Sequence, residues 1–157
     1  MSMGVDQQRV TELLEREHRA YVEARPRTLE LWRRAEASMP NGVPMSWLRN
    51  SFEPIPMWVD EGRGAHFRDV DGHDYLDTNI ADMSMFTGYA PEPVVRAVAE
   101  RMSRGSQFMA PTEDACWVAE ELGRRYGVPL WQFTLSATHA NNEALRVARA
   151  STGRDVV

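Results

Sequence analysis

The pair Asp71-Gly72 lies between two short β-type runs and constrains the fold of this 157-residue chain more than any other local feature. Glycine readily adopts the positive φ that a tight hairpin turn requires. β-Type residues occupy the runs at 65–70 and 75–77, and a third run at 57–59 precedes a separator at 61–64 that contains two glycines. The sequence therefore predicts a small antiparallel meander of three short strands.

Helical periodicity dominates on both sides of this meander. Apolar residues between positions 5 and 24 recur at near-helical spacing and predict an amphipathic helix that Pro26 ends. A second helix is expected up to the turn Pro40-Asn41-Gly42, and the prolines of residues 43–56 indicate an irregular loop. The elements expected downstream are a helix over 91–102, a helix over 112–126 that Thr112 caps and Gly127 ends, a strand over 131–135 and a helix over 139–150.

Composition and charge exclude several classes of protein. The net charge is −5 and the arginines are scattered among acids, so we expect no nucleic-acid partner. No apolar run approaches the roughly 18 residues of a membrane span, and residues 1–9 are polar, which favours a cytoplasmic protein. The single cysteine, Cys116, fits a reducing compartment. The four histidines lack metal-ligand spacing, so no metal site is expected.

The chain contains no lysine, because all 18 residues counted as Lys+Arg are arginines. Covalent attachment to an aldehyde cofactor needs a primary amine that can be deprotonated. A guanidinium stays protonated in proteins and cannot supply that amine. Lysine-based covalent catalysis is therefore excluded for this chain alone, and we assign no catalytic residue to it.

The segment that offers the most groups for binding a ligand is the turn Ser136-Ala137-Thr138, between the expected strand and the last helix. Unpaired N–H groups and the helix dipole at such a turn attract phosphate, and both hydroxyls can add donors. On spacing alone, helix capping by Ser and Thr is the more common role. His139 begins the helix after this turn and is a candidate for a cofactor contact.

Trp47 lies in the proline-containing loop, where no packed core is expected. It can form an aromatic wall for a small substrate, or it can pack on the domain as an ordinary loop residue. The sequence favours neither alternative.

Colinear segments along most of the chain resemble the class III pyridoxal-phosphate (PLP) aminotransferases of fold type I, and within them the glutamate-1-semialdehyde 2,1-aminomutase branch. The segments that carry this resemblance are the turn at 39–43, the meander at 64–72, Tyr75-Leu76-Asp77, Gly88, residues 91–95, Gly105-Ser106, residues 110–113, residues 133–141 and residues 145–154. The resemblance covers nearly all residues after about 28. It implies an α/β fold: the N-terminal part of fold type I.

The resemblance implies three parts: a helical arm at 1–40, the loop and meander of a small domain at 41–90, and the truncated start of the PLP-binding large domain at 91–157. It also implies that Ser136, Ala137 and Thr138 hold the phosphate of PLP with His139 nearby. Ser46 and Trp47 are then expected at the substrate. A homodimer is implied, formed through the arm and the loop at 105–113.

Three positions depart from the family pattern. Ala137 replaces a glycine that usually follows the serine, and His139 replaces a common glutamate. Asp82 stands where the aminomutase branch commonly has a tryptophan of the substrate pocket. An amino acid or β-amino acid aminotransferase is therefore as well supported as an aminomutase, and Asp82 becomes the third substrate-site candidate.

Family members continue past position 157 to an aspartate that pairs with the cofactor ring and to the lysine that binds it. We therefore expect this chain to act as part of a PLP-dependent aminotransferase or aminomutase of small amino or keto acids, inactive alone and completed by a lysine-bearing segment. The alternative is a non-catalytic remnant that dimerises or binds a partner.

Overall fold

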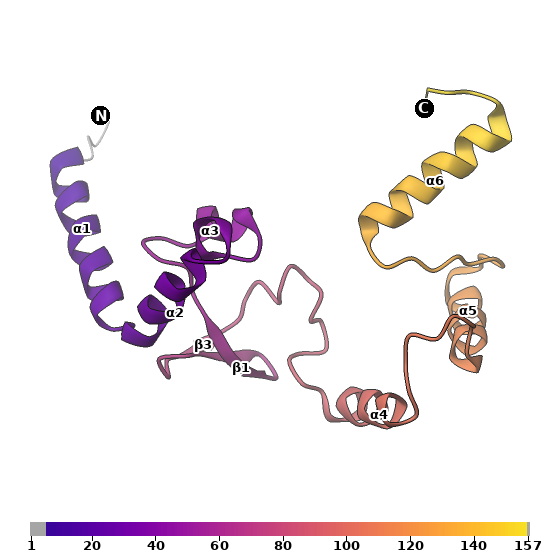
Figure 1. Cartoon of the computed structure of the whole chain (residues 1–157), viewed down its shortest axis with the longest axis horizontal. Coiled ribbons are helices and arrows are strands. Elements are labelled where there is room, and N and C mark those ends of the chain that lie inside the picture. Colours follow the sequence, from indigo (N-terminus) through magenta and orange to yellow (C-terminus); the bar gives the residue numbers. More distant parts are fainter. Residues whose placement is uncertain (1–5, 157) are drawn as a thin grey trace, which may run out of the picture. The chain divides into compact units, whose positions relative to one another are not determined.

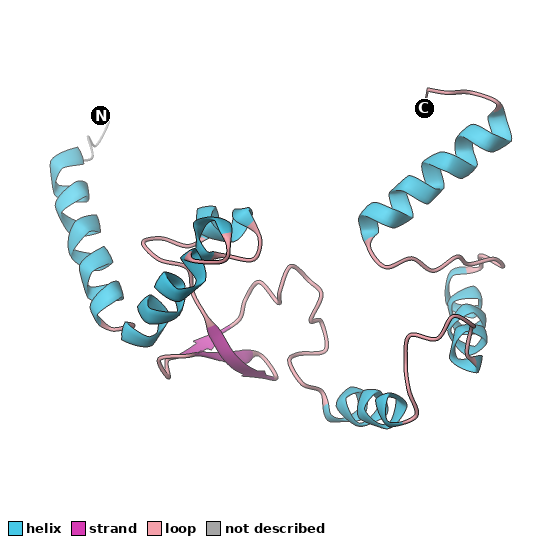
Figure 2. Cartoon of the chain, viewed as in Figure 1, coloured by secondary structure: helices cyan, strands magenta, loops and turns pink. Residues whose placement is uncertain are grey.

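The computed structural model describes residues 6–156, which divide into two compact units, one ending at Arg104 and one beginning at Gly105. Figure 1 shows the order of the elements, and Figure 2 shows that all strands belong to the first unit. The first unit comprises α1 (Gln7–Glu23), α2 (Pro26–Glu36), the 3-10 turn η1 (Pro40–Gly42), α3 (Ser46–Ser51), β1 (Val59–Arg63), β2 (His66–Asp69), β3 (Asp74–Leu76) and α4 (Glu92–Ser103). The second comprises α5 (Glu113–Tyr126) and α6 (Ala137–Thr152). The expected division at residues 40 and 90 stays a prediction.

Between residues 6 and 156, no helix has the length and apolar character needed to cross a bilayer.

The predicted meander is confirmed as an antiparallel sheet with the strand order β1-β2-β3. Phe67 on β2 lies opposite Gly62 on β1 and opposite Tyr75 on β3. β1 starts two residues later than the predicted run and extends through the expected separator, so that part of the prediction was wrong. A Cβ at Gly62 would lie 2.7 Å from the ring of Tyr89, so glycine acts there as a strand residue that makes room for a ring.

The two faces of the sheet differ in chemistry. On one face, Phe67 stacks on Tyr75 with ring centroids 4.9 Å apart, and Tyr89 meets Phe67 edge-on at 6.5 Å. Across the strands Arg68 pairs with Asp74 at 2.8 Å and with Glu61 at 3.8 Å. These ion pairs are exposed and add little stability, so the aromatic cluster is the main packing element of the sheet.

The hairpin turn between β2 and β3 also caps α2. Arg25, at the N-cap position of α2, makes no side-chain capping bond. Instead the carboxylate of Asp71 accepts the N–H of Arg27 at 2.7 Å and the N–H of Thr28 at 2.9 Å. Two of the unsatisfied N–H groups that begin a helix are thus satisfied from a residue more than 40 positions away.

Asp69 lies beneath the same turn with its side chain fully buried. It accepts hydrogen bonds from the N–H groups of Asp71 and His73 and, at 2.8 Å, from the hydroxyl of Tyr75. Arg25 donates to the Tyr75 oxygen at 2.6 Å, and its Nε lies 3.4 Å from the Asp69 carboxylate. The buried charge is therefore paired and hydrogen-bonded, as a buried carboxylate must be.

The electrostatics of this turn keep both carboxyls ionised. Burial works to raise the pKa of Asp69, but the hydrogen bonds from His73 and Tyr75 outweigh it and hold the pKa below its usual value. Burial also works to raise the pKa of Asp71, but the hydrogen bonds from Thr28 and Arg27 outweigh it and lower that pKa. The attachment of the arm to the sheet therefore depends on two ionised carboxylates.

The loop expected at residues 43–56 contains a helix that the sequence did not predict. This helix, α3, contacts the turn η1, which itself packs on α2. Trp32 on α2 donates from Nε1 to the carbonyl of Asn41 at 3.1 Å, and a Cβ at Gly42 would lie 2.4 Å from that indole. Asn41 and Gly42 both have positive φ, which lets the chain turn tightly over the tryptophan.

The second unit agrees with the predicted helices in type and differs in detail. Gly127 ends α5 with φ of +69°, as predicted. Thr112 occupies the N-cap position of α5, as predicted, but its hydroxyl donates to Asp114 and makes no capping bond to a backbone N–H. The run 131–135 is not assigned as a strand, since no described segment pairs with it. α6 begins at Ala137, two residues earlier than expected.

Few apolar side chains are buried in either unit. The buried apolar residues within 6–156 are Ala35, Val43, Ile55 and Pro56, all in the first unit. α4, α5 and α6 contain no buried residue. Their exposed apolar side chains are those of Val94, Val95, Val98, Met102, Trp117, Val118, Tyr126, Leu145 and Val147. Exposed apolar side chains in such number are typical of interaction surfaces.

Asp71→Ala removes the cap of α2 and is expected to lower the free energy of unfolding by about 1 kcal/mol. The matched change Asp74→Ala removes a carboxylate from the same hairpin, whose ion pair with Arg68 is exposed, and should cost less. Urea unfolding followed by circular dichroism measures both. Equal losses in the two variants would contradict the capping role of Asp71.

Acid should destabilise the attachment of the arm. The pKa values of Asp69 and Asp71 are lowered in the folded state, so their contribution is complete above the unfolded value of about 3.9 and is lost as the pH falls through the folded values. The urea midpoint should therefore decrease steadily below about pH 4 to 5. Asp71→Asn should flatten this decrease, whereas Asp60→Asn on β1 should not. A midpoint that rises on acidification would refute this assignment.

Candidate functional site

The turn before α6 lies where an extended segment meets a 16-residue helix. Ser136 is the N-cap residue, with extended backbone angles, and its Oγ accepts the N–H of His139 at 3.2 Å. The hydroxyl of Thr134 donates to the Ser136 carbonyl at 3.1 Å and steadies the approach to the helix. The structure thus confirms the capping role of Ser136 that spacing alone favoured.

Capping by Ser136 leaves two N–H groups of the first turn available. His139 N–H donates to Ser136 Oγ, and Ala140 N–H donates to the Ser136 carbonyl at 3.0 Å. The N–H groups of Ala137 and Thr138 have no intrahelical acceptor, because they begin the helix. The Thr138 hydroxyl also makes no hydrogen bond within the described chain. Capping and anion binding are therefore compatible at this turn.

Ala137 does not disturb the geometry of the turn. It is the first helical residue of α6 and is absent from the described residues that have positive φ. An alanine here supplies the same N–H as a glycine without backbone strain. The departure at this position leaves the donor set intact.

The charge around the first turn of α6 favours an anion. The turn contains no acidic residue, and the nearest carboxylate along the helix, Glu143, is paired with Arg146 at 2.7 Å. The helix dipole adds a partial positive charge at this end. Two N–H donors, two hydroxyls and the dipole form a donor set that fits a phosphate group.

The other candidates, Ser46, Trp47 and Asp82, belong to the first unit, whereas the turn at 136–139 belongs to the second. Ser46 begins α3 and Trp47 follows it, with 51% of its surface exposed. A cavity of about 160 Å³ beside α3 is lined by Leu48 and Phe52 but not by Ser46 or Trp47. The exposed position of Trp47 is consistent with a wall for a ligand, and the role of both residues stays a prediction.

Asp82 lies in a backbone turn whose residues have left-handed, positive φ values. Ile80, Ala81, Asp82 and Met83 all have φ between +48° and +66°, a left-handed turn without glycine. Each such residue costs about 1–2 kcal/mol of backbone strain. Strain of this kind persists only where surrounding contacts fix it, and it concentrates at functional sites.

Side chains of two preceding residues hold this strained turn. Asp77 accepts the N–H groups of Asn79 and Ile80 at 2.9 and 2.8 Å. Asn79 accepts the N–H of Asp82 at 2.6 Å and donates its side-chain amide to the Asp82 carboxylate at 3.1 Å. One carboxylate oxygen of Asp82 is therefore engaged locally, and the other remains available to a ligand.

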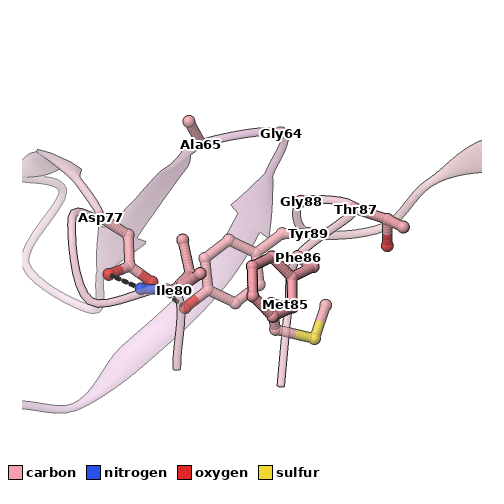
Figure 3. A pocket seen from close by; sticks show the side chains of 9 residues that line it. All are labelled: Gly64, Ala65, Asp77, Ile80, Met85, Phe86, Thr87, Gly88 and Tyr89. Atoms are coloured by element: carbon pink, nitrogen blue, oxygen red, sulfur yellow. Dashed lines mark hydrogen bonds between the residues drawn. The ribbon is translucent and has the colours of Figure 1, made fainter. Parts of the chain in front are cut away.

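The strained turn borders a cavity of about 280 Å³, shown in Figure 3. Its lining consists of Gly64, Ala65, Asp77, Ile80, Met85, Phe86, Thr87, Gly88 and Tyr89, so Asp82 lies outside it. Tyr89 closes the loop, because its backbone exchanges two hydrogen bonds with Gly64 and its hydroxyl donates to Asp77. That hydrogen bond raises the pKa of Tyr89 and lowers the pKa of Asp77.

Sequence reasoning missed Asp77, Asn79 and Tyr89 as the residues that shape this loop. The pattern Asp-x-Asn is a local signal for side chains that bond to backbone N–H groups two or three positions ahead. The role of Tyr89 had no such signal, because its partners are 12 and 25 positions away. Asp82 itself was singled out only through the family pattern.

Known proteins of one family match most of this chain in sequence and in structure. The sequence profile described as Aminotransferase class-III matches residues 48–156. A glutamate-1-semialdehyde 2,1-aminomutase of Methanothermobacter thermautotrophicus is 40% identical over 129 residues, which are 80% of this chain and 30% of that protein. The chain spans about a third of the length of the relatives it matches.

Solved structures of aminomutases and aminotransferases contain this fold. The glutamate-1-semialdehyde aminomutase of Pseudomonas aeruginosa PAO1 is 40% identical with a TM-score of 0.89, covering 98% of this chain and 34% of that one, and a variant of it was solved in complex with PMP. The β-phenylalanine aminotransferase of Variovorax paradoxus is 27% identical with a TM-score of 0.85, covering 92% and 34%. The mixed α/β architecture is thus an N-terminal portion of the fold type I transferases. By its sequence and its fold, this chain belongs to the class-III aminotransferase family.

Proposed function

We propose that this chain is the N-terminal part of a PLP-dependent aminotransferase or aminomutase, where it binds the cofactor phosphate and forms part of the substrate pocket. The observation that carries the proposal is the first turn of α6, which presents the free N–H groups of Ala137 and Thr138 in a member of the class-III family. When bound, PLP supplies an electron sink for moving an amino group on a small amino or keto acid.

The residues of the turn hold and orient the phosphate in this proposal. The N–H groups of Ala137 and Thr138 donate to phosphate oxygens, and the hydroxyls of Ser136 and Thr138 complete the set. Charge-assisted hydrogen bonds of this kind are about twice as strong as neutral ones. The turn therefore fixes the position of the cofactor but contributes no reacting group.

The reacting amine must come from outside these 157 residues, because the sequence contains no lysine. The exposed apolar faces of α4, α5 and α6 support a second polypeptide segment that packs against them. The greater length of the relatives supports the same conclusion. We propose that the complete enzyme is a homodimer in which the arm and the loop at 105–113 meet the neighbouring subunit.

The substrate pocket is proposed to include Ser46, Trp47 and Asp82. Trp47 offers an exposed ring and Asp82 a free carboxylate oxygen. A carboxylate where the aminomutase branch has a tryptophan favours a ligand that carries a hydrogen-bond donor or a positive charge. Glutamate-1-semialdehyde carries an ammonium group just as amino acids and β-amino acids do, so this carboxylate fits all three. We therefore propose a small amino or keto acid substrate, with an aminotransferase or an aminomutase activity.

A second candidate function is non-catalytic: a remnant that dimerises or binds a partner through the same apolar faces. The exposed apolar side chains of α4, α5 and α6 are the observation that favours it. The two functions differ in whether the assembled complex retains PLP and transfers an amino group.

Assembly with a polypeptide that carries the remaining two thirds of the Pseudomonas relative should yield a complex that retains PLP during gel filtration and transfers amino groups. Ser136→Ala/Thr138→Val is expected to weaken PLP binding about tenfold, because it removes two hydroxyl donors. The matched change Ser151→Ala/Thr152→Val, at the far end of α6, should leave binding unchanged. A complex that assembles but retains no PLP would support the remnant instead.

Ser46→Ala in the assembled enzyme is expected to raise KM for the amino acid substrate about tenfold, the effect of losing one hydrogen bond to a charged group. Ser51→Ala is the matched control, because its hydroxyl bonds to the Trp47 carbonyl within the same short helix. Steady-state kinetics measures both variants. An unchanged KM for Ser46→Ala would remove this residue from the substrate site.

A further inference from the structure

His139 occupies the third helical position of α6 and turns back toward the N-cap residue. Its Nδ1 lies 3.2 Å from Ser136 Oγ, and its backbone N–H donates to that same oxygen. Ser136 Oγ is therefore shared by two groups of one residue. The family resemblance places a glutamate commonly at this position, and this chain has a histidine there instead.

The Ser136 hydroxyl can donate only one hydrogen bond, and this limit links its contact with His139 to ligand binding. A serine hydroxyl has one hydrogen to donate and two lone pairs that accept. When Nδ1 is unprotonated, it accepts the Ser136 hydrogen, and that hydroxyl is not available to a phosphate. When Nδ1 carries a proton, it and the N–H of His139 fill both lone pairs, and the Ser136 hydrogen is left for an outside acceptor.

We propose that His139 is a positioning residue that donates from Nδ1 to Ser136 Oγ and thereby directs the Ser136 hydroxyl to a phosphate oxygen. This inference rests on the proposed function, since it assumes that the turn holds a phosphate. A phosphate dianion offers only acceptors, so it selects the arrangement in which Ser136 donates. Phosphate binding therefore favours the arrangement in which the hydrogen between the two side chains lies on Nδ1.

Two substitutions separate this role from simple helix capping. The side-chain end of asparagine coincides with the Nδ1 position of histidine, whereas that of glutamine coincides with the Nε2 position. His139→Asn can therefore keep the donor to Ser136, and His139→Gln cannot. Both variants keep the backbone N–H that Ser136 caps, so a purely structural role would not distinguish them.

The binding experiment uses the chain assembled with the lysine-bearing polypeptide at constant pH, with pyridoxamine 5′-phosphate as the probe and pyridoxamine as its phosphate-free counterpart. Affinity for the phosphate probe should fall about fivefold to tenfold in His139→Gln and remain near wild type in His139→Asn, while affinity for pyridoxamine should not change. Circular dichroism checks that both variants keep α6.

A second measurement reports on the imidazole directly. In the complex assembled with the ¹⁵N-labelled wild-type chain, the phosphate probe should move the His139 Nδ1 resonance toward the shift of a ring nitrogen that carries hydrogen, and Ser136→Ala should abolish this movement. Equal affinities in the glutamine and asparagine variants, or an Nδ1 resonance that does not move, would overturn the role of His139 while the phosphate site stands. If the assembled wild-type complex binds neither probe, the proposed phosphate site itself fails, and this inference fails with it.

Discussion

Two carboxylates in one hairpin turn hold the first unit together. Asp71 caps α2, and Asp69 lies buried between Arg25, His73 and Tyr75. Few apolar side chains are buried among the described residues of this unit, so these polar contacts are the main link between α2 and the sheet. The arm therefore attaches through directional polar bonds, whose geometry fixes the angle between helix and turn more tightly than apolar contact does.

The local parts of the fold were predictable from the sequence. The turn at Asp71-Gly72, the break at Pro26 and the stop at Gly127 each follow from the conformational freedom or restriction of one residue. Features that depend on distant partners were not predictable. Gly62 looked like part of a separator because its neighbour, Tyr89, follows 27 positions later. The run 131–135 looked like a strand, but a strand needs a partner to pair with.

The candidate site also has parts that were predictable from the sequence and parts that were not. The turn at Ser136–Thr138 follows from the strand, turn and helix order, and the structure resolves the choice between capping and phosphate binding by allowing both. Ser136 caps with an oxygen while Ala137 and Thr138 keep their N–H groups free. The role of Tyr89 could not be read from the sequence, because its partners lie 12 and 25 positions away, and a left-handed turn without glycine has no sequence signature of its own.

That left-handed turn reverses the usual rules of substitution. Glycine weakens a right-handed helix or a strand, because its freedom in the unfolded chain is lost on folding. At Ala81, where φ is +48°, glycine would instead remove a steric cost that the alanine carries in the folded state. The chain therefore carries at this point a residue that its backbone disfavours, and the hydrogen bonds from Asp77 and Asn79 hold the turn in place. The strain that these bonds hold lies beside the cavity that Ile80 helps to line, and glycine at Ala81 would release part of it.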